Sequence, residues 1–545
     1  MQPVGVEEKL RALKNYRTKT DVVLKPVRAM KKSFTGLDGK ERPLSLRYYQ
    51  VIGVLHLIFA DRFILGDDCG LGKTIQTITA LAALWERGEA RRTVVVTIKS
   101  SVRQWEKEFY KFLEEGTVRI FLCVGSPAKR KKIYEEFLAY NQGPVVLIVG
   151  YATLRQDITI VQGWTDFCMV CDEATAFKNP STRTWQVIKH LAGRAHKAWG
   201  LSATIIKNKI LDGYGIYSAI VPTLFSSSRN KFVTEFCITR LVDIPGSRRK
   251  ILQIEGSTKA QVAAFREKID LYFLGRAKHE VASELPTLTI REEEIFLSPG
   301  QRRLYSEIRE GCFVPPKKKL EEGDMGDEPM SALAKLTYYQ QAANHPKLCG
   351  VDAVSSKFAR LLELVEESDL SEEKIIIYTR FREMVDLGIK EFEARGIRCT
   401  RITGKENKVE QRDKAQSLFQ SATSGVNVIW ITNAASESIN LQAAKAIVFY
   451  DTPWTGGEYI QIIGRMVRIG SLHDKCLAIH LIAKGTIDKQ TTAALEASME
   501  TIEGVLGKRL QGEREGVDVL PSSQSFEDLL RSVEKLELPT EVDET

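Results

Sequence analysis

The 545-residue sequence has no apolar run of the roughly 20 residues that a membrane-spanning helix needs. Its best candidate, residues 51–60, is too short and is followed by Asp61 and Arg62. The first residues, MQPVGVEEKL, lack the apolar core of a signal peptide. We therefore expect a soluble, cytoplasmic protein.

The sequence has few cysteines: there are nine, an odd number, and they are scattered along the chain. This argues against a disulfide framework and favours a reducing compartment. Cys168 and Cys171 form a CxxC, but a structural zinc site needs a second pair at suitable spacing, and the sequence has none. Because they lie in the apolar run FCMVCDEA, we expect two cysteines on a buried strand.

An excess of acidic charge is also missing, since the net charge is +8 and the sequence pI is near 8.8. The basic residues concentrate before about residue 330, whereas the last 25 residues carry seven acids and two bases. This balance indicates an anionic partner, and nucleic acid fits it, although charge alone does not establish the partner.

What the sequence has is an alternation of β-rich apolar runs with helical patterns. Predicted strands lie at 63–65, 93–98, 120–124, 145–149, 167–170 and 198–201, with helices at 74–87, 101–114 and 128–140 between them. Further strands are predicted at 374–379, 399–402, 426–431 and 446–450. Such alternation predicts parallel sheets flanked by helices.

The alternation lapses between the two series, and this sets the predicted domains. We expect a basic N-terminal arm (1–40), a first α/β lobe (41–228), a mostly helical connector (229–350), a second α/β lobe (351–505) and a loosely ordered acidic tail (506–545).

A phosphate-binding loop is predicted in GDDCGLGKT, between a predicted strand and a predicted helix. Gly70 and Gly72 let the backbone approach phosphate oxygens, and the helix N-terminus offers N–H groups to them. Lys73 would reach the β- and γ-phosphates, and Thr74 would bind Mg²⁺. The strict motif has glycine where this chain has Asp67.

Two adjacent carboxylates, Asp172 and Glu173, follow the apolar run FCMVC. Two carboxylates that follow a buried strand together are costly in free energy unless they bind a cation or take part in a proton transfer. We expect Asp172 to bind Mg²⁺ and Glu173 to orient and deprotonate the attacking water.

The motif QIIGRMVR, residues 461–468, is predicted to be helical. A spacing of three places Arg465 and Arg468 on one helical face, which suits the charge that develops on a γ-phosphate. The alternative is a surface helix with solvated arginines.

Together these motifs resemble superfamily-two helicases, and in detail the Swi/Snf-type helicase-like ATPases. The resemblance spans roughly residues 44–495. It is carried by LRYYQ from Leu46, TIKSSVRQWEKEF, GYATL, AFKNPS, LGRAKHEVASELP, Asn344-His345-Pro346, Asn440-Leu441 and Asp451-x-x-Trp454.

This resemblance implies two tandem RecA-like lobes joined by a helical connector, with ATP and Mg²⁺ as cofactors and duplex DNA as the expected partner. The implied nucleotide-binding residues are Arg47, Gln50, Asp68, Gly70, Leu71, Gly72, Lys73 and Thr74. The implied catalytic residues are Lys73, Asp172, Glu173, Gln461, Arg465 and Arg468, of which Arg465 and Arg468 would reach a nucleotide bound between the lobes. The implied nucleic-acid contacts are Lys99, Ser100, Tyr151, Arg380, Thr432, Asn433 and Trp454.

Departures from the family pattern leave alternatives open. The triplet Ser202-Ala203-Thr204 is closer to the general helicase version, so strand separation and duplex translocation both remain candidates. An RNA helicase, a nucleotide-gated DNA-binding module and a motor subunit of a larger complex are the other hypotheses. No accessory domain is recognised in this sequence, so we expect a phage or bacterial member.

Overall fold

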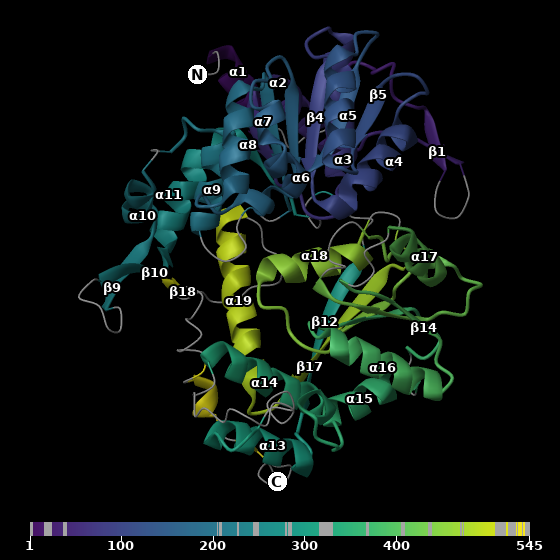
Figure 1. Cartoon of the computed structure of the whole chain (residues 1–545), viewed down its shortest axis with the longest axis vertical. Helices are drawn as coiled ribbons and strands as arrows, with labels where there is room; N and C mark the ends of the chain where they lie inside the picture. The colour runs from purple at the N-terminus through teal and green to yellow at the C-terminus, as the bar shows by residue number, and fades with distance from the viewer. Residues whose placement is uncertain are drawn as a thin grey trace. The chain divides into compact units, whose positions relative to one another are not determined.

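The computed structural model describes residues 4–15, 24–35, 41–203, 205, 210–225, 228–243, 250–277, 281, 286–314, 331–366, 370–404, 409–433, 439–468, 471, 473–506, 519–521, 530, 532–536 and 538–539. The chain divides into two compact units (Figure 1). Unit 1 comprises Met1–Ser283 and Glu500–Ser522, and unit 2 comprises Glu284–Met499 and Ser523–Thr545.

A seven-stranded, all-parallel sheet organises unit 1, in the order β11-β3-β8-β7-β4-β6-β5. Its strands are β3 (Arg62–Leu65), β4 (Arg92–Thr97), β5 (Arg119–Cys123), β6 (Val145–Gly150), β7 (Cys168–Asp172), β8 (Lys197–Leu201) and β11 (Phe273–Leu274). The helices of this unit are α1 (Val4–Asn15), α2 (Tyr48–Phe59), α3 (Lys73–Glu86), η1 (Lys99–Ser101), α4 (Val102–Phe112), α5 (Pro127–Ala139), α6 (Tyr151–Gln156), α7 (Ile158–Val161), η2 (Ala174–Phe177), α8 (Arg183–Arg194), α9 (Ile210–Ile220), α10 (Arg229–Phe236), α11 (Lys259–Ile269) and η3 (Asp270–Tyr272).

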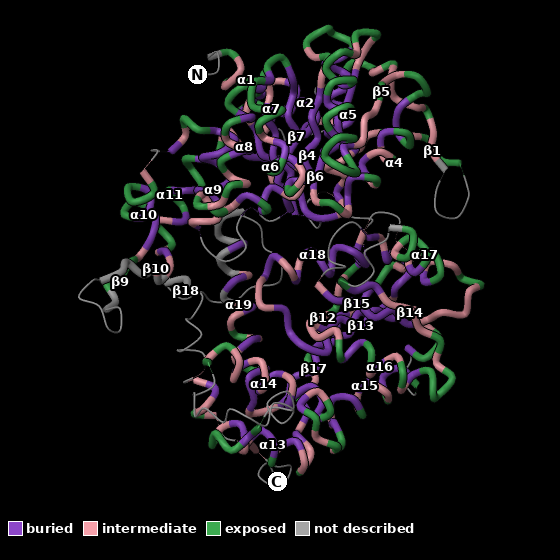
Figure 2. The backbone as a smooth tube through the Cα atoms, viewed as in Figure 1, coloured by how far each residue is buried: buried purple, intermediate pink, exposed green. Residues whose placement is uncertain are grey.

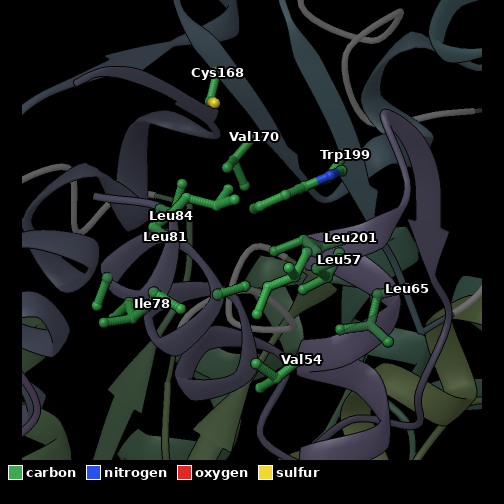
Figure 3. Close-up of a cluster of buried hydrophobic side chains, with 14 of the residues drawn as sticks. Val54, Leu57, Leu65, Ile78, Leu81, Leu84, Cys168, Val170, Trp199 and Leu201 are labelled. Carbon is green, nitrogen blue, oxygen red and sulfur yellow. The ribbon is translucent and has the colours of Figure 1, made fainter. Parts of the chain in front are cut away.

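The core of unit 1 forms where α2 and α3 pack on the sheet. Figure 3 shows Val54 and Leu57 of α2, Leu81 of α3 and the strand residues Val170 and Trp199 in one cluster of buried side chains. All five are buried, and the central strands β4, β6, β7 and β8 are buried along nearly their whole length (Figure 2). Strands buried on both faces read as unbroken apolar runs, which is why the sequence predicts them well.

Unit 2 is built on a six-stranded, all-parallel sheet in the order β12-β17-β16-β13-β15-β14. Its strands are β12 (Thr287–Ile295), β13 (Ile375–Tyr378), β14 (Cys399–Ile402), β15 (Val428–Ile431), β16 (Ala446–Phe449) and β17 (Lys475–Ala483). Its helices are α13 (Pro299–Glu310), α14 (Ala332–Asn344), η5 (Pro346–Cys349), α15 (Ser356–Glu366), α16 (Arg382–Ala394), α17 (Val409–Gln420) and α18 (Gly456–Met466), and α19 (Ile487–Leu506) crosses the boundary between the units.

Alternate residues of β13 serve two separate cores. Ile376 and Tyr378 join a cluster that includes buried residues of α17 and α18, while Ile375 and Ile377 join a cluster with α15 and α16. Because successive strand side chains point to opposite faces, helices cover both faces of this sheet. The predicted α/β class with two flanked parallel sheets is therefore confirmed.

The segment predicted as a mostly helical connector differs from the prediction. Besides α10, α11, α13 and α14, its described residues form four strands, and the boundary between the units falls inside it. β11 adds to the edge of the first sheet beside β3, and β12 adds to the edge of the second beside β17. β11 has two residues, and β12 (TLTIREEEI) is half exposed and acid-rich, so neither gives the apolar run of a central strand.

Short antiparallel sheets involve the chain ends. β1 (Ser33–Thr35) pairs with β2 (Glu41–Pro43), and β9 (Ile238–Asp243), β10 (Lys250–Thr258) and β18 (Val519–Pro521) form a three-stranded sheet. Within the predicted acidic tail, β18 pairs with β10 and Val533 is fully buried in a unit 2 core. The expectation of a loosely ordered tail is thus wrong for these described residues, because backbone pairing and burial fix them. Among the described residues no helix is long and apolar enough to span a membrane.

Candidate functional site

The predicted phosphate loop lies between β3 and α3 in unit 1. Gly70 and Gly72 have φ of 90° and 80°, a region that favours glycine, and Gly72 is the N-cap of α3. A Cβ on Gly72 would lie 2.6 Å from Nε2 of Gln50, so a side chain there would also collide. Lys73 begins the helix, and its Nζ donates to the backbone oxygens of Asp67 (2.7 Å) and Asp68 (3.3 Å).

Gln50, near the start of α2, contacts this loop, and Arg47 is the N-cap of the same helix. Gln50 accepts a hydrogen bond from the Arg47 N–H (2.9 Å), and its Nε2 donates to the Leu71 oxygen (3.2 Å). The Tyr49 hydroxyl donates to the same oxygen (3.2 Å). Two side chains of α2 therefore fix the middle of the loop.

The two predicted carboxylates stand at the carboxyl end of β7. Oδ2 of Asp172 accepts hydrogen bonds from Thr97 Oγ1 (3.0 Å) and Trp105 Nε1 (2.8 Å). Glu173 follows in a left-handed conformation, with φ of 52° and ψ of 59°. Such a backbone costs of order 1 kcal/mol for a residue with a side chain, and strain of this kind clusters at functional sites.

Burial, followed by the charge of the neighbouring Glu173, raises the pKa of Asp172 to about 6. The hydrogen bonds from Trp105 and Thr97 act in the opposite direction on this pKa, as does the positive charge of Lys73. The loop lysine and the acidic pair are therefore close enough to interact electrostatically at one edge of the sheet.

Three predicted nucleic-acid contacts lie at the same sheet edge. Lys99 and Ser100 form η1 directly after β4, and Tyr151 begins α6 directly after β6, the neighbour of β4. A Cβ on Gly150 would lie 3.8 Å from Cα of Lys99, so the two loops touch. Lys99 is exposed. Tyr151 is buried, and its hydroxyl donates to the backbone oxygen of Asp172 (2.7 Å). Tyr151 thus connects this edge to the acidic pair.

In unit 2, Arg380 follows β13 at the carboxyl edge of the second sheet. Its guanidinium donates to Gln340 Oε1 (3.1 Å) and lies 4.8 Å from the ring centroid of Trp454. Asp451, after β16, accepts from Thr379 Oγ1 (2.6 Å) and from the Arg380 N–H (2.9 Å). The predicted contacts Arg380 and Trp454 therefore lie together.

Thr432 and Asn433 follow β15, the other neighbour of β13. Thr432 is buried, and its N–H donates to the Ile402 oxygen (3.3 Å). Asn433 Oδ1 accepts a hydrogen bond from the Tyr378 hydroxyl. Both residues therefore belong to the same carboxyl edge as Arg380.

The predicted arginine motif lies at the end of α18. Gln461 and Arg465 are helical and buried. α18 ends at Met466, so Arg468 lies beyond it and donates to Asn440 Oδ1 instead. The prediction that Arg465 and Arg468 share one helical face is wrong, because the chain leaves the helix at Val467 with ψ of 94°.

The SNF2-related domain family matches residues 49–348, more than half of the chain, and the helicase conserved C-terminal domain family matches residues 356–470. The chain belongs to the SNF2-related family. The resemblance inferred from the motifs is thereby confirmed.

Two relatives among the SNF2-related and ATP-dependent helicase proteins share about a quarter of the aligned residues with this chain. This chain is similar to an uncharacterized ATP-dependent helicase of Mycoplasma pneumoniae, with 25% identity over 469 residues that cover 85% of this chain and 42% of the relative. It is 23% identical over 517 residues to the transcription regulatory protein SNF2 of Saccharomyces cerevisiae, covering 90% of this chain and 29% of that protein. The chain thus spans less than half the length of these relatives.

Among solved structures, this SNF2-related chain is similar to the Sulfolobus solfataricus SWI2/SNF2 ATPase core in complex with dsDNA. The TM-score is 0.39 and the identity 23%, covering 85% of this chain and 93% of that chain.

Sequence reasoning missed three side chains of this SNF2-related site. Thr97 and Trp105 hold Asp172, and Arg276 contacts Asp67 beside the loop. Trp105 and Arg276 lie in fragments that carry the family resemblance, but their partners are 67 and 209 residues away. Of the Ser-Ala-Thr triplet, Ser202 is buried and its N–H donates to the Leu65 oxygen (3.2 Å), while Thr204 lies outside the described residues.

Proposed function

We propose that this SNF2-related chain is a DNA-dependent ATPase that couples ATP hydrolysis to movement along duplex DNA. The observation that carries the proposal is that Lys73, in the loop after β3, and the Asp172–Glu173 pair, at the end of β7, stand at the carboxyl edge of one parallel sheet, where the lysine charge lowers the pKa of Asp172. A phosphate-binding lysine beside such a pair is the arrangement that nucleoside triphosphate hydrolysis requires.

ATP binding is proposed at the loop between β3 and α3. The positive φ of Gly70 and Gly72 suits phosphate oxygens, as does the N-terminus of α3, whose N-cap Gly72 makes no side-chain cap hydrogen bond. Lys73 Nζ would exchange its two backbone carbonyl partners for the β- and γ-phosphates. Arg47 and Gln50 would contact adenine beside the loop, with Asp68 and Leu71 completing its backbone.

Mg²⁺ is proposed to bind Thr74 and Asp172. Both hydrogen bonds described for the Asp172 carboxylate go to Oδ2, which leaves Oδ1 for a cation. Thr74, the second residue of α3, offers a hydroxyl oxygen, and oxygen ligands are those that Mg²⁺ prefers. The bound ion would neutralise charge on the β- and γ-phosphates.

For hydrolysis, Glu173 would orient a water molecule and accept its proton. The water oxygen bonds to the γ-phosphorus while the bond to the β–γ bridging oxygen breaks, giving ADP and phosphate. Arg465 and Arg468 are proposed to neutralise the charge that develops on the γ-phosphate, with Gln461 positioning the same group.

DNA is proposed as the polymer because the chain is SNF2-related, carries a net charge of +8, and places Lys99, Ser100 and Arg380 at strand ends. Contacts would go mainly to phosphates, so sequence preference should be weak. We propose that four further residues at these strand ends contribute to the same DNA-binding surfaces: Tyr151, Thr432, Asn433 and Trp454. We further propose that the protein acts in the cytoplasm of a bacterial or phage-infected cell; the bacterial source of the Mycoplasma relative fits a bacterial cell.

The first test is steady-state ATP hydrolysis with no polymer, duplex DNA, single-stranded DNA and RNA. Stimulation by duplex DNA, lost in Lys73→Ala and Glu173→Gln, is the expected result. Glu173→Gln should still bind ATP, whereas Lys73→Ala should not. Stimulation by RNA alone would instead establish an RNA helicase, and ATP binding without turnover would establish a nucleotide-gated binding module.

Movement and strand separation need separate assays. Displacement of a triplex-forming strand reports translocation on duplex DNA, and displacement from a fork reports unwinding. We expect displacement of the triplex-forming strand. If the protein displaced a strand from the fork only, its activity would be strand separation and not translocation on duplex DNA.

The DNA contact at Lys99 can be tested by salt dependence. Lys99→Ala should lower the slope of log K against log salt by about one phosphate contact. Lys131→Ala removes the same charge from an exposed position on α5 and serves as the matched control. Equal slopes for both variants would remove Lys99 from the interface.

A further inference from the structure

A buried ion pair lies directly beside the phosphate loop. Asp67 is completely buried, and Arg276 is 9% exposed. The guanidinium binds the carboxylate in a two-pronged manner, with Nε donating to Oδ1 (2.8 Å) and Nη2 to Oδ2 (2.5 Å). Gln76 of α3 adds a third hydrogen bond, from its Nε2 to Oδ2 (3.0 Å).

Burying such a pair gives little net stability, because desolvating two charges offsets most of their attraction. Its position suggests a different benefit. Asp67 stands where the strict loop motif has glycine, and its backbone oxygen accepts the hydrogen bond from Lys73 Nζ (2.7 Å). Fixing the Asp67 side chain therefore fixes a backbone atom that holds the phosphate-binding lysine.

The same guanidinium also reaches the adenine side of the loop. Arg276 Nη1 donates to the backbone oxygen of Tyr49, and the guanidinium lies 5.2 Å from the centroid of the Tyr49 ring. Tyr49 and the next residue, Gln50, both donate to Leu71 in the loop. One arginine thus braces the start of the loop through Asp67 and its middle through α2.

The cluster has no spare room. Gly53 of α2 faces it, and a Cβ there would lie 1.8 Å from Gln76 Oε1 and 3.0 Å from Arg276 Nη2. Nη2 also donates to Gln76 Oε1 (3.1 Å), so the side chains lock one another. A rigid surround of this kind is what holds a binding site in one geometry.

The backbone on either side of Arg276 follows the loop as well. Leu274 accepts a hydrogen bond from the Gly66 N–H (2.7 Å), and the Arg276 oxygen accepts one from the Asp68 N–H (3.1 Å). Leu274 is the last residue of β11, and Arg276 lies just after this strand. β11 is the last described strand of unit 1 before the chain continues to β12 of unit 2. The segment that leads out of unit 1 is therefore paired to the loop by main chain and side chain.

We propose that Arg276 is a positioning residue for nucleotide binding: through Asp67 and Tyr49 it fixes the phosphate loop and the adenine-contacting start of α2 in one geometry. The proposal rests on the nucleotide site proposed above. Arg276 touches no substrate, so its effect should fall on the affinity for ATP more than on the rate at saturation.

The chain offers a matched control. Arg130, 8% exposed, makes an equivalent two-pronged pair with Asp157, with both N–O distances 2.7 Å. A backbone oxygen, that of Gly125, and the Tyr134 hydroxyl complete its surroundings, as Tyr49 does for Arg276. This second pair lies in the same unit, on α5 and the start of α7, away from the loop.

Arg276→Lys and Arg130→Lys should lose similar thermal stability, because lysine cannot reproduce a two-pronged contact. Only Arg276→Lys should weaken binding of a fluorescent ATP analogue and raise KM for ATP, by roughly tenfold, the effect of one lost charged hydrogen bond. kcat at saturating ATP should change less than threefold, an estimate that follows from loss of binding shared by ground and transition states.

Arg276→Lys with wild-type affinity, or equal loss of affinity in Arg130→Lys, would overturn the proposal. Asp67→Asn, which keeps size and shape, carries the same test if Arg276→Lys does not fold. Failure of the nucleotide site itself is distinguishable, since wild-type protein would then bind the analogue no better than Lys73→Ala.

Discussion

Replacing Trp105 by phenylalanine tests how the metal ligand is held. The substitution removes the indole N–H that donates to Asp172 Oδ2 (2.8 Å) and keeps an aromatic ring against Phe109, whose centroid lies 5.9 Å away. The lost interaction is with the ionised carboxylate, so its loss should make Asp172 harder to ionise.

The size of the effect follows from the pKa of Asp172, which burial raises to about 6 while the Trp105 hydrogen bond opposes the increase. A hydrogen bond to a charged group contributes about 1.5–3 kcal/mol, or about one to two pK units if it acts on the ionised form alone. The pKa of Asp172 in Trp105→Phe should therefore rise toward neutrality. A protonated carboxyl cannot bind Mg²⁺, so protons should compete with the metal at higher pH.

The assay is kcat/KM for ATP against pH, because its acidic limb reports groups of the free enzyme. In Trp105→Phe this limb should move up by about one pH unit, and half-maximal activity near neutral pH should need roughly tenfold more Mg²⁺.

Trp85→Phe is the matched control. Trp85 is buried against the same Phe109 ring, 6.5 Å between centroids, but its Nε1 has no hydrogen-bond partner among the described residues. Its pH profile and Mg²⁺ requirement should stay at the wild-type values. An unmoved acidic limb in Trp105→Phe, or an equal shift in both variants, would refute the reasoning.

Two further predictions concern stability. Gly53→Ala should lower the free energy of unfolding by roughly 1–3 kcal/mol in urea titrations, because its Cβ would lie 1.8 Å from Gln76 Oε1; an unchanged midpoint would contradict this crowding. Burial lowers the pKa of His56, His345 and His480 to about 4 from an ordinary 6.5. Their neutral forms stabilise the fold fully above pH 6.5, and each should lose about 2 kcal/mol of this stability by pH 5, since only the unfolded chain takes up the proton. Urea unfolding between pH 7.5 and 5 checks this, and His480→Phe should reduce the pH slope by about one proton; an identical slope would remove His480 from the account.

The sequence predicted those parts of the fold whose signal is local. α3 begins at Lys73 and β7 ends at Asp172, within one or two residues of the predicted helix (74–87) and strand (167–170), because an apolar run followed by glycines or acids marks both places without distant information. β11 and β12 were missed, since edge strands lack that apolar run. The placement of Arg468 failed for a related reason: helix ends depend on tertiary contacts, here with Asn440.

The contacts that brace the site could not be predicted, because each joins residues far apart in the chain. Asp67 gave a partial signal, since an acid within a buried phosphate loop requires a cation. With 78 lysines and arginines in the chain, the sequence could not choose among them. The fold makes the choice by adding β11 beside β3, which brings Arg276 to the loop across 209 residues. The short edge strand that sequence reasoning overlooked is therefore the element that completes the phosphate loop.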